Sequence, residues 1–266
     1  MSRFGTASRL HVTSAPSPRN HRSYDAAYYG PNGPAENRDS AQHVVPLVSS
    51  LIHPSSVVDV GCGSGAWLDV FRRHGASRIL GLDGYNVDPA WLCIPRDCFR
   101  ALDLSKPFQV AEVFDLAVCL EVAEHLPKHA APGFIQSLAR LAPVVLFSAA
   151  VPLQGGTHHV NEQWPGFWQD LFEKQGYRML DLIRKEIWTK PEVQFWYRQN
   201  IFLFVVEDWV ASCPRFQEAA AFAGDLMLIH RDIWERQFGL RALLRQLPGS
   251  AFRAVRQLSR RLSLAA

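Results

Sequence analysis

The stretch of sequence that decides the fold is Val57-Val58-Asp59-Val60-Gly61-Cys62-Gly63-Ser64-Gly65. Its first half is β-branched and predicts a buried strand, which the alternate glycines then end in a turn. Glycine is required where the backbone takes positive φ or where a ligand leaves no room for a Cβ. Because residues 66–74 continue with helical periodicity, the turn joins a strand to a helix. This arrangement predicts a loop that binds a nucleoside, and its spacing differs from the Gly-x-Gly-x-x-Gly of dinucleotide-binding loops.

Strands and helices alternate on both sides of this turn. Apolar runs predict further strands at 78–82, 97–101, 114–120, 144–149, 178–182 and 201–206. Helical spacing of apolar residues predicts helices at 36–51, 66–74, 133–141 and 165–175. Such alternation requires a mostly parallel sheet with helices on both faces, joined by right-handed crossovers. The predicted fold class is therefore α/β, doubly wound.

The length and composition are those of one catalytic domain with appendages. The 266 residues are 48% hydrophobic and 20% charged, which is enough for one substantial core. We divide the chain into a basic, disordered leader at 1–23, the domain at 24–235 and a basic amphipathic tail at 236–266. No run approaches 18 apolar residues, and the start of the chain lacks the apolar centre of a secretory signal. We therefore expect a cytoplasmic protein.

The charge is distributed unevenly along the chain. Residues 25–235 carry 17 Lys and Arg against all 25 acidic residues, a net charge of −8, while both tails are purely basic. An acidic body argues against nucleic-acid binding, which needs a basic patch on the folded domain. The arginine-rich tail could give weak contact with a membrane surface or another anionic partner. The five cysteines contain no Cys-x-x-Cys pair, so neither disulfides nor a zinc site is expected.

The glycine-rich segment resembles the first motif of class I S-adenosylmethionine-dependent methyltransferases, small-molecule branch. That motif is an acidic residue, any residue and then Gly-x-Gly-x-Gly, which residues 59–65 match without a gap. The resemblance implies a Rossmann-like, seven-stranded sheet and S-adenosyl-L-methionine as the cofactor. It also implies that the loop wraps around the methionine part of the cofactor and that the cofactor-binding residues there are Asp59, Gly61, Cys62, Gly63 and Gly65.

Two further acidic positions extend the predicted cofactor site. Asp83, Gly84 and Tyr85 follow the second predicted strand, which a parallel sheet places beside the first. The carboxylate of Asp83 could then accept both ribose hydroxyls, and Tyr85 could lie against the adenine. Asp103 and Leu104 match the position that reads the amino edge of adenine in the family.

The fourth strand ends in a stretch that resembles the Glu-x-x-Glu-His-Leu of small-molecule methyltransferases. Ligands of open α/β sheets bind outside the carboxyl ends of the strands, so Glu121, Val122 and His125 are expected at the cofactor. The Asn/Asp-Pro-Pro-aromatic motif of base-modifying amino-methyltransferases is absent from this position, which disfavours a nucleobase nitrogen as target. Upstream, the segment around Tyr29 resembles segments that fold over the cofactor in this family.

The candidate catalytic residues are His158, His159 and Glu162, in the polar loop after the fifth strand. A hydroxyl acceptor must lose a proton, and histidine titrates in the right range. Neighbouring residues of an extended chain point to opposite sides, so one of the two histidines is expected to face the substrate. The alternative is that both only hydrogen-bond the loop. No metal is expected, because adjacent histidines rarely reach one ion.

The sequence thus predicts transfer of a methyl group to an oxygen of a small molecule, a saccharide or secondary metabolite, with a histidine as general base. Loops of the His-His-x-Asn-Glu kind resemble those of methyltransferases from such pathways. Two alternatives remain open: a membrane-borne lipid or quinone as acceptor, and a non-catalytic, cofactor-binding partner subunit. The segment from Ile187 to Tyr197 is predicted to be a substrate lid.

Overall fold

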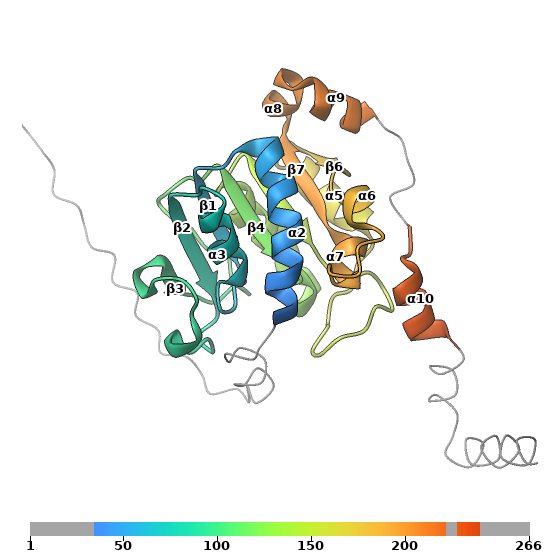
Figure 1. Cartoon of the computed structure of the whole chain (residues 1–266), viewed down its shortest axis with the longest axis horizontal. Coiled ribbons are helices and arrows are strands. Elements are labelled where there is room, and N and C mark those ends of the chain that lie inside the picture. The colour runs from blue at the N-terminus through green and yellow to red at the C-terminus, as the bar shows by residue number, and fades with distance from the viewer. Residues whose placement is uncertain (1–34, 222–227, 240–266) are drawn as a thin grey trace, which may run out of the picture.

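The computed structural model describes residues 35–221 and 228–239 and is built around one sheet (Figure 1). Within these residues the sheet has seven strands in the order β3-β2-β1-β4-β5-β7-β6. In that order the strands are Phe99–Ala101, Arg78–Asp83, Ser56–Val60, Leu116–Leu120, Val144–Ser148, Phe202–Val206 and Tyr177–Leu180. The first five are parallel, and β7 runs antiparallel to both β5 and β6. The predicted α/β, doubly wound, mostly parallel fold is confirmed.

Helices cover both faces of the sheet because alternate strand residues point to opposite sides. On one face lie α2 (Ala35–Ile52), α3 (Ala66–Arg73), α6 (Arg184–Ile187) and α7 (Phe195–Asn200). On the other lie α4 (Ala131–Ala139) and α5 (Pro165–Glu173). Val57 packs into the first core and its neighbour Val58 into the second, and both are fully buried. A central strand buried on both faces accounts for the continuous apolar run in the sequence.

The remaining helices are short. Four 3₁₀ turns are η1 (Pro89–Trp91), η2 (Arg96–Cys98), η3 (Ala123–His125) and η4 (Lys128–Ala130). After β7 come α8 (Glu207–Ser212), α9 (Pro214–Ala221) and α10 (Arg231–Phe238). Helix α10 continues past Glu235, so the domain boundary expected there falls inside a helix. The expected leader at 1–23 and most of the tail at 236–266 lie outside the described residues, and these divisions stay predictions.

The parallel register brings the carboxyl ends of the central strands to one edge. Asp59 pairs with Gly81 on β2 and with Val118 on β4, and Leu120 pairs with Ser148 on β5. The loops that leave β1, β2, β4 and β5 therefore meet at this edge. These loops contain the motifs that the sequence singled out.

The segment predicted as a lid is anchored in the core at three positions. Ile187, Val193 and Tyr197 are buried in the same core cluster as α2, and the other residues of the segment are partly or fully exposed. The Tyr197 hydroxyl donates to Asn37 Oδ1 at 3.1 Å, and the Tyr197 ring meets the Trp67 ring edge-on at 5.2 Å. Opening the whole segment would expose these three apolar side chains, so the structure disfavours the predicted lid.

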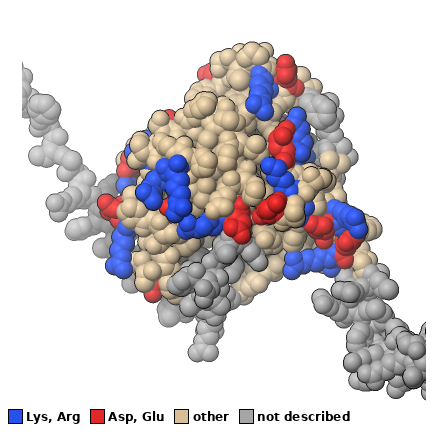
Figure 2. Space-filling view, in the orientation of Figure 1, with Lys and Arg blue, Asp and Glu red and all other residues tan. Residues whose placement is uncertain are grey.

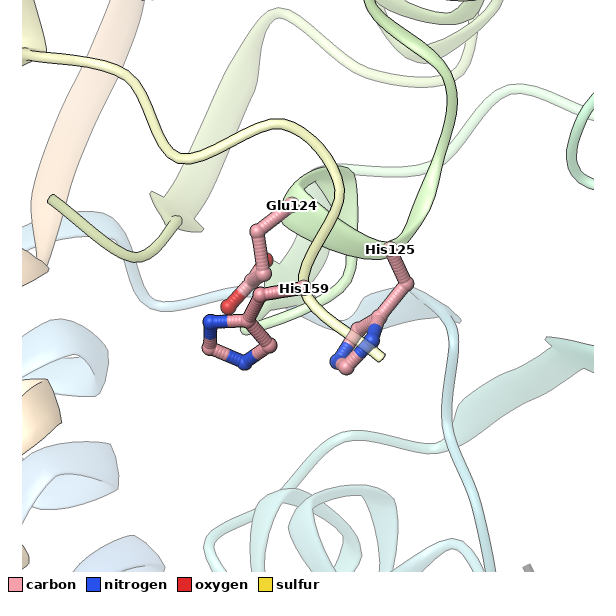
Figure 3. A group of neighbouring side chains, drawn as sticks. All are labelled: Glu124, His125 and His159. Carbon is pink, nitrogen blue, oxygen red and sulfur yellow. The ribbon is translucent and has the colours of Figure 1, made fainter. Parts of the chain in front are cut away.

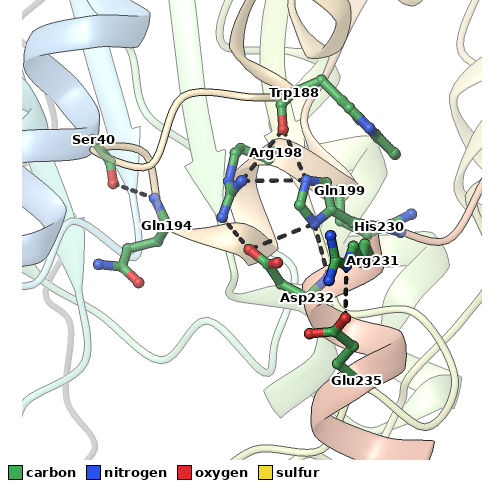
Figure 4. A network of polar contacts seen from close by, with 9 residues as sticks. All are labelled: Ser40, Trp188, Gln194, Arg198, Gln199, His230, Arg231, Asp232 and Glu235. Carbon is green, nitrogen blue, oxygen red and sulfur yellow. Dashed lines mark hydrogen bonds and ion pairs between the residues drawn. The ribbon is translucent and has the colours of Figure 1, made fainter. Parts of the chain in front are cut away.

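A network of polar contacts joins α10 to α7 (Figure 4). The buried guanidinium of Arg198 forms an ion pair with Asp232, and the backbone amide of His230 donates to the side chain of Gln199. His230 Nδ1 accepts from the backbone amide of Asp232, so the ring proton lies on Nε2 and is donated to the Trp188 carbonyl at 2.8 Å. These contacts hold α10 against α7.

The charges on the face shown in Figure 2 are mixed in sign. Asp69 is bound by Arg38 and Arg73, each at 2.8 Å, and Arg100 pairs with Glu112 at 2.6 Å. The opposite charges in each of these ion pairs largely cancel each other. Within the described residues, no helix combines the length and the apolar character needed to span a membrane.

Candidate functional site

The glycines of the first loop are required by both conformation and space. Gly61, Gly63 and Gly65 have φ of 83°, 54° and 80°. A Cβ on Gly61 would lie 2.2 Å from a methyl of Val122, and one on Gly65 would lie 2.9 Å from Ile94. Any other residue at 61 or 65 would therefore be strained and would collide with a neighbouring loop, and any other residue at 63 would be strained. The loop is a backbone cradle at the carboxyl edge of the sheet.

Asp83 lies beside this cradle and holds it in shape. Its Oδ2 accepts the amide of Gly63 and its Oδ1 accepts the amide of Gly84, both at 2.6 Å. Burial raises the pKa of this carboxyl, and the two amide hydrogen bonds oppose that effect. Asp59 is also buried, and burial together with the charge of Asp83 holds its pKa well above the usual range. Asp83 therefore lies beside the glycine loop, and its predicted role at the ribose hydroxyls stays a prediction.

Cys62 packs the glycine loop against strand β2. Its side chain is buried, and a Cβ built on Gly81 of β2 would lie 2.7 Å from its sulfur. The Cys62 thiol therefore occupies the space that the missing side chain of Gly81 leaves. Burial is the main reason that the pKa of this thiol is well above its ordinary value. Cys62 supports the cradle by packing.

The residues predicted around the adenine lie further out. The side chain of Tyr85 is 58% exposed. The carboxylate of Asp103 accepts from the Ser105 amide at 3.0 Å and pairs with Lys106 at 2.9 Å, while Leu104 is buried. These contacts account for the turn after β3, and the adenine-reading roles stay predictions. Tyr29 lies outside the described residues.

The end of β4 contributes a polar cluster that the sequence analysis found only in part. Glu121, at φ 55°, accepts from Asn200 at 3.1 Å and from Gln154 at 3.0 Å. Asn200 also donates to Gln154 at 2.8 Å. Sequence reasoning missed Gln154 and Asn200, because only the fold brings α7 beside the loop after β5. Val122 packs against Gly61, which links this cluster to the glycine loop.

Glu124 is a second residue that sequence reasoning did not single out, although it stands in the quoted motif. Its side chain is fully buried, and its Oε1 accepts from the Ala150 amide at 3.2 Å. Its Oε2 has no hydrogen-bond partner. Burial and the neighbouring charge of Glu121 hold its pKa well above the usual range. Its carbonyl also accepts the amides of Val160 and Asn161, which anchors the loop after β5.

Of the two histidines in that loop, the structure turns His159 inward. Figure 3 shows its ring beside Glu124 and His125, and the two imidazoles meet edge-on at 4.9 Å. Its Nδ1 lies 2.9 Å from Glu162 Oε1, and its side chain is 12% exposed. His158 has φ 61° and is exposed. Burial and the charge of His159 lower the pKa of His125 to about 4, so this ring is neutral at pH 7.

Glu162 organises the loop as well as His159. Its two carboxylate oxygens accept from the amides of Leu153 and Gly155, both at 2.8 Å. A cavity of about 320 Å³ opens beside it, lined by Leu153, Gly155, Glu162, Gln237 and Phe238. Helix α10 thus forms one wall of a hollow next to the histidine cluster.

A model of a protein family, described as a methyltransferase domain, matches residues 35–182. This match spans more than half of the chain and includes both the glycine loop and the histidine cluster. The chain belongs to this methyltransferase family. S-adenosyl-L-methionine is therefore the methyl donor, and the resemblance stated from residues 59–65 is confirmed.

Two solved structures share the fold of this methyltransferase. A sugar N-methyltransferase from a Streptoalloteichus species is 16% identical, with a TM-score of 0.51, covering 76% of this chain and 99% of the other. DesVI from Streptomyces venezuelae is 14% identical, with a TM-score of 0.50, covering 71% and 100%. Among curated proteins, the ubiquinone biosynthesis O-methyltransferase of Neisseria meningitidis is 32% identical over 95 residues. That match covers 32% of this methyltransferase and 38% of the relative's length.

The cradle fits the methyl donor on the evidence of its own atoms. The left-handed glycines turn the backbone tightly at the carboxyl edge of the sheet, with Val122 and Ile94 packed against Gly61 and Gly65, and Asp83 places a carboxylate at the end of the neighbouring strand. We infer that residues 61–65 and Asp83 hold the nucleoside and the methionine part. Substitution of Asp83 tests this proposal.

Replacing Asp83 with asparagine is expected to weaken binding of S-adenosylhomocysteine by about 10²-fold or more, because hydrogen bonds to charged groups contribute about 1.5–3 kcal/mol each. The new amide group would also face an N–H donor of Gly63 or Gly84. Calorimetric titration measures the effect. The matched control is Asp88→Asn, at an exposed carboxylate that also caps a turn by accepting from Ala90. Equal affinities in both variants would contradict the assignment.

Replacing Gly156 with alanine is expected to displace the ring of His159. A Cβ at this position would lie 2.2 Å from His159 Nε2, and the φ of Gly156 is not in the left-handed region. We expect methyl transfer to fall by about 10-fold, as misplacement of a catalytic group predicts, with affinity for S-adenosylhomocysteine unchanged. Parallel rate and binding measurements check this, and an unaltered rate would mean that the ring position does not matter.

Proposed function

We propose that this methyltransferase transfers a methyl group to a hydroxyl oxygen of a small molecule, and that His159 accepts the hydroxyl proton. The observation that supports this most is the pair formed by His159 and Glu162. With Nδ1 held by Glu162 at 2.9 Å, the proton of the neutral ring lies on Nδ1 and Nε2 carries a lone pair. A base oriented by a carboxylate is a recurring arrangement for removing a hydroxyl proton.

The methyl donor supplies an already activated sulfonium, so the protein has to align the partners, exclude water and remove a proton. Alignment is the task of the loops at the carboxyl edge of the sheet, where the glycine cradle and the histidine cluster meet through Val122. The loop after β5 is held rigidly by Glu124 and Glu162, which together accept four of its amides besides that of Ala150. A rigid support for His159 lowers the cost of reaching the reactive geometry.

The acceptor is a small molecule with both apolar and polar parts. The cavity of about 320 Å³ beside Glu162 is lined by the apolar Leu153 and Phe238 as well as by Gln237. That volume lies at the lower end of the range of about 300–1,000 Å³ for small-molecule pockets. This cavity borders Glu162, whose carboxylate holds His159, and it supports a small acceptor such as a hydroxylated saccharide or secondary metabolite.

A second candidate acceptor is a hydroxyl of a quinone precursor. It is favoured by the match to the ubiquinone biosynthesis O-methyltransferase, whose name specifies oxygen as the methylated atom. Both candidates share the chemistry at His159 and differ in the acceptor's apolar part. Flotation with liposomes, comparing the full chain with one truncated after Gly239, tests whether membrane delivery separates the two.

The experiment that tests the function is release of S-adenosylhomocysteine in the presence of panels of hydroxylated acceptors. Sugars, phenols and catechols would be compared with matched amines and with the corresponding methyl ethers, which have no hydroxyl to methylate. Turnover of hydroxyl acceptors alone supports the proposal. Turnover of amines with no turnover of hydroxyls would replace oxygen by nitrogen as the target.

A further inference from the structure

Three side chains of types that can bind a metal ion converge at the end of β4. They are Glu124 and His125 from η3 and His159 from the loop after β5, and Figure 3 shows the three side chains close together. One carboxylate oxygen and one ring nitrogen from each imidazole lie within 4.8 Å of one another. Glu124 and His125 are adjacent in the sequence, but His159 belongs to a distant loop. The fold therefore creates the cluster.

The carboxylate of Glu124 is incompletely satisfied. The side chain is fully buried, its Oε1 accepts from Ala150, and its Oε2 has no partner. The carboxylate of Glu121 approaches the same group and repels it. A buried carboxylate oxygen without a donor is costly, and either a proton or a bound cation removes that cost. This orphaned oxygen is independent evidence, besides the grouping itself, that the cluster binds a ligand.

The imidazole of His159 is oriented by a carboxylate, since its Nδ1 lies 2.9 Å from Glu162 Oε1. Metal-binding histidines almost always donate their second ring N–H to a carboxylate or a backbone carbonyl. Such a partner fixes the tautomer, so that the remaining nitrogen presents a lone pair. His159 shows this feature.

We propose that Glu124, His125 and His159 bind one divalent first-row transition-metal cation such as Zn²⁺. Two imidazoles and one carboxylate favour such an ion over Mg²⁺, which prefers oxygen ligands. Ligands at about 2.1 Å from one tetrahedral ion lie about 3.4 Å apart, so the longest separation in the cluster, which is within 4.8 Å, would close by up to about 1.4 Å on binding. Three protein ligands leave coordination positions open, as in catalytic rather than structural sites.

The proposal deepens the proposed function at the acceptor oxygen. A hydroxyl oxygen bound at the open position would have a lowered pKa and could release its proton to water. The ion would then do the work assigned to His159, whose Nε2 becomes a ligand. The reason that sequence analysis expected no metal was that His158 and His159 are adjacent. The structure instead pairs His159 with His125, which comes from a different strand end.

The test is titration of the tag-free, chelator-treated full chain with ZnCl₂ by calorimetry, and with CoCl₂ by visible absorption. We expect one ion per chain, with Mg²⁺ binding more weakly than Zn²⁺. Glu124→Gln and His159→Gln should each weaken Zn²⁺ binding by about 100-fold or more, and Glu162→Gln, behind His159, by about 10–100-fold. The matched control is His129→Gln, at an exposed histidine four residues after His125.

Two measurements keep this result independent of folding and of the proposed function. Glu124→Gln retains an oxygen for the Ala150 amide, and thermal unfolding of each variant shows whether it folds. His159→Gln, in a partly exposed loop, provides a second variant if Glu124→Gln does not fold. The metal site is overturned if the unaltered protein binds Zn²⁺ no more tightly than these two variants. It is also overturned if His129→Gln loses as much Zn²⁺ affinity as they do. Hydroxyl methylation by a chain that binds no ion would leave the proposed function standing.

Discussion

Replacing His159 with glutamine is expected to lower kcat by about 10²- to 10⁴-fold, the usual contribution of a positioned acid or base. Glutamine fills similar space but supplies neither a proton acceptor nor an imidazole ligand, so the loss follows under either role of His159. Cofactor affinity should change little, because His159 lies with Glu124 and His125 rather than in the glycine cradle. Single-turnover rates with a hydroxyl acceptor and titration with S-adenosylhomocysteine measure the two quantities separately.

The comparison that decides between the two loop histidines is His158→Gln. Because the side chain of His158 is exposed, we expect at most a few-fold change in kcat. A fall in His158→Gln that matches the fall in His159→Gln would reassign the base. The surface variant His129→Gln serves as the baseline for replacing any histidine of this chain.

Replacing Gly61 with alanine is expected to destabilise the protein by about 2–5 kcal/mol, combining a left-handed backbone with an overpacked contact. The added Cβ would lie 2.2 Å from a methyl of Val122 at φ 83°. Relief of this collision would deform the cradle, so affinity for S-adenosylhomocysteine should fall below detection. Chemical denaturation and calorimetric titration provide the two readouts.

A matched control separates backbone strain from the collision. Gly176 has φ 80°, and a Cβ built there would meet nothing within 4 Å. Gly176→Ala should therefore cost only about 1–2 kcal/mol and leave cofactor binding intact. Combining Gly61→Ala with Val122→Ala removes the two colliding methyls and should restore part of the stability. Equal destabilisation by the two single alanine variants would show that Val122 does not limit the space at Gly61.

Loss of ligand binding has a different meaning in the glycine cradle and in the histidine cluster. Loss of cofactor binding in the cradle variants would leave the identity of the acceptor untouched. Loss of Zn²⁺ binding in the cluster variants would leave the cradle untouched. The two sites approach each other at the contact between Val122 and Gly61. Substitutions away from that contact, one in each site, are therefore expected to have additive effects on the free energy of unfolding.

The sequence by itself determined the α/β fold class and the glycine loop, and the cofactor followed from the resemblance of that loop to the first motif of class I methyltransferases. These features are local: Asp59 to Gly65 is one continuous segment, and its strand, turn and helix follow from β-branched residues and glycines that are neighbours in the chain. Asp83 could be added because a parallel sheet places the end of β2 beside the end of β1. Periodicity and topology rules are sufficient for inferences of this kind.

Only the tertiary structure decided which side chains gather at the loop after β5. The inward direction of His159, in contrast to the exposed His158, depends on a loop whose course is set by amides donated to Glu124 and Glu162. The contacts of Glu121 with Asn200 join segments 79 residues apart. Side-chain directions in irregular loops depend on long-range packing and hydrogen bonding, for which local sequence carries no periodic signal. The cluster of Glu124, His125 and His159 is therefore visible only when the chain is folded.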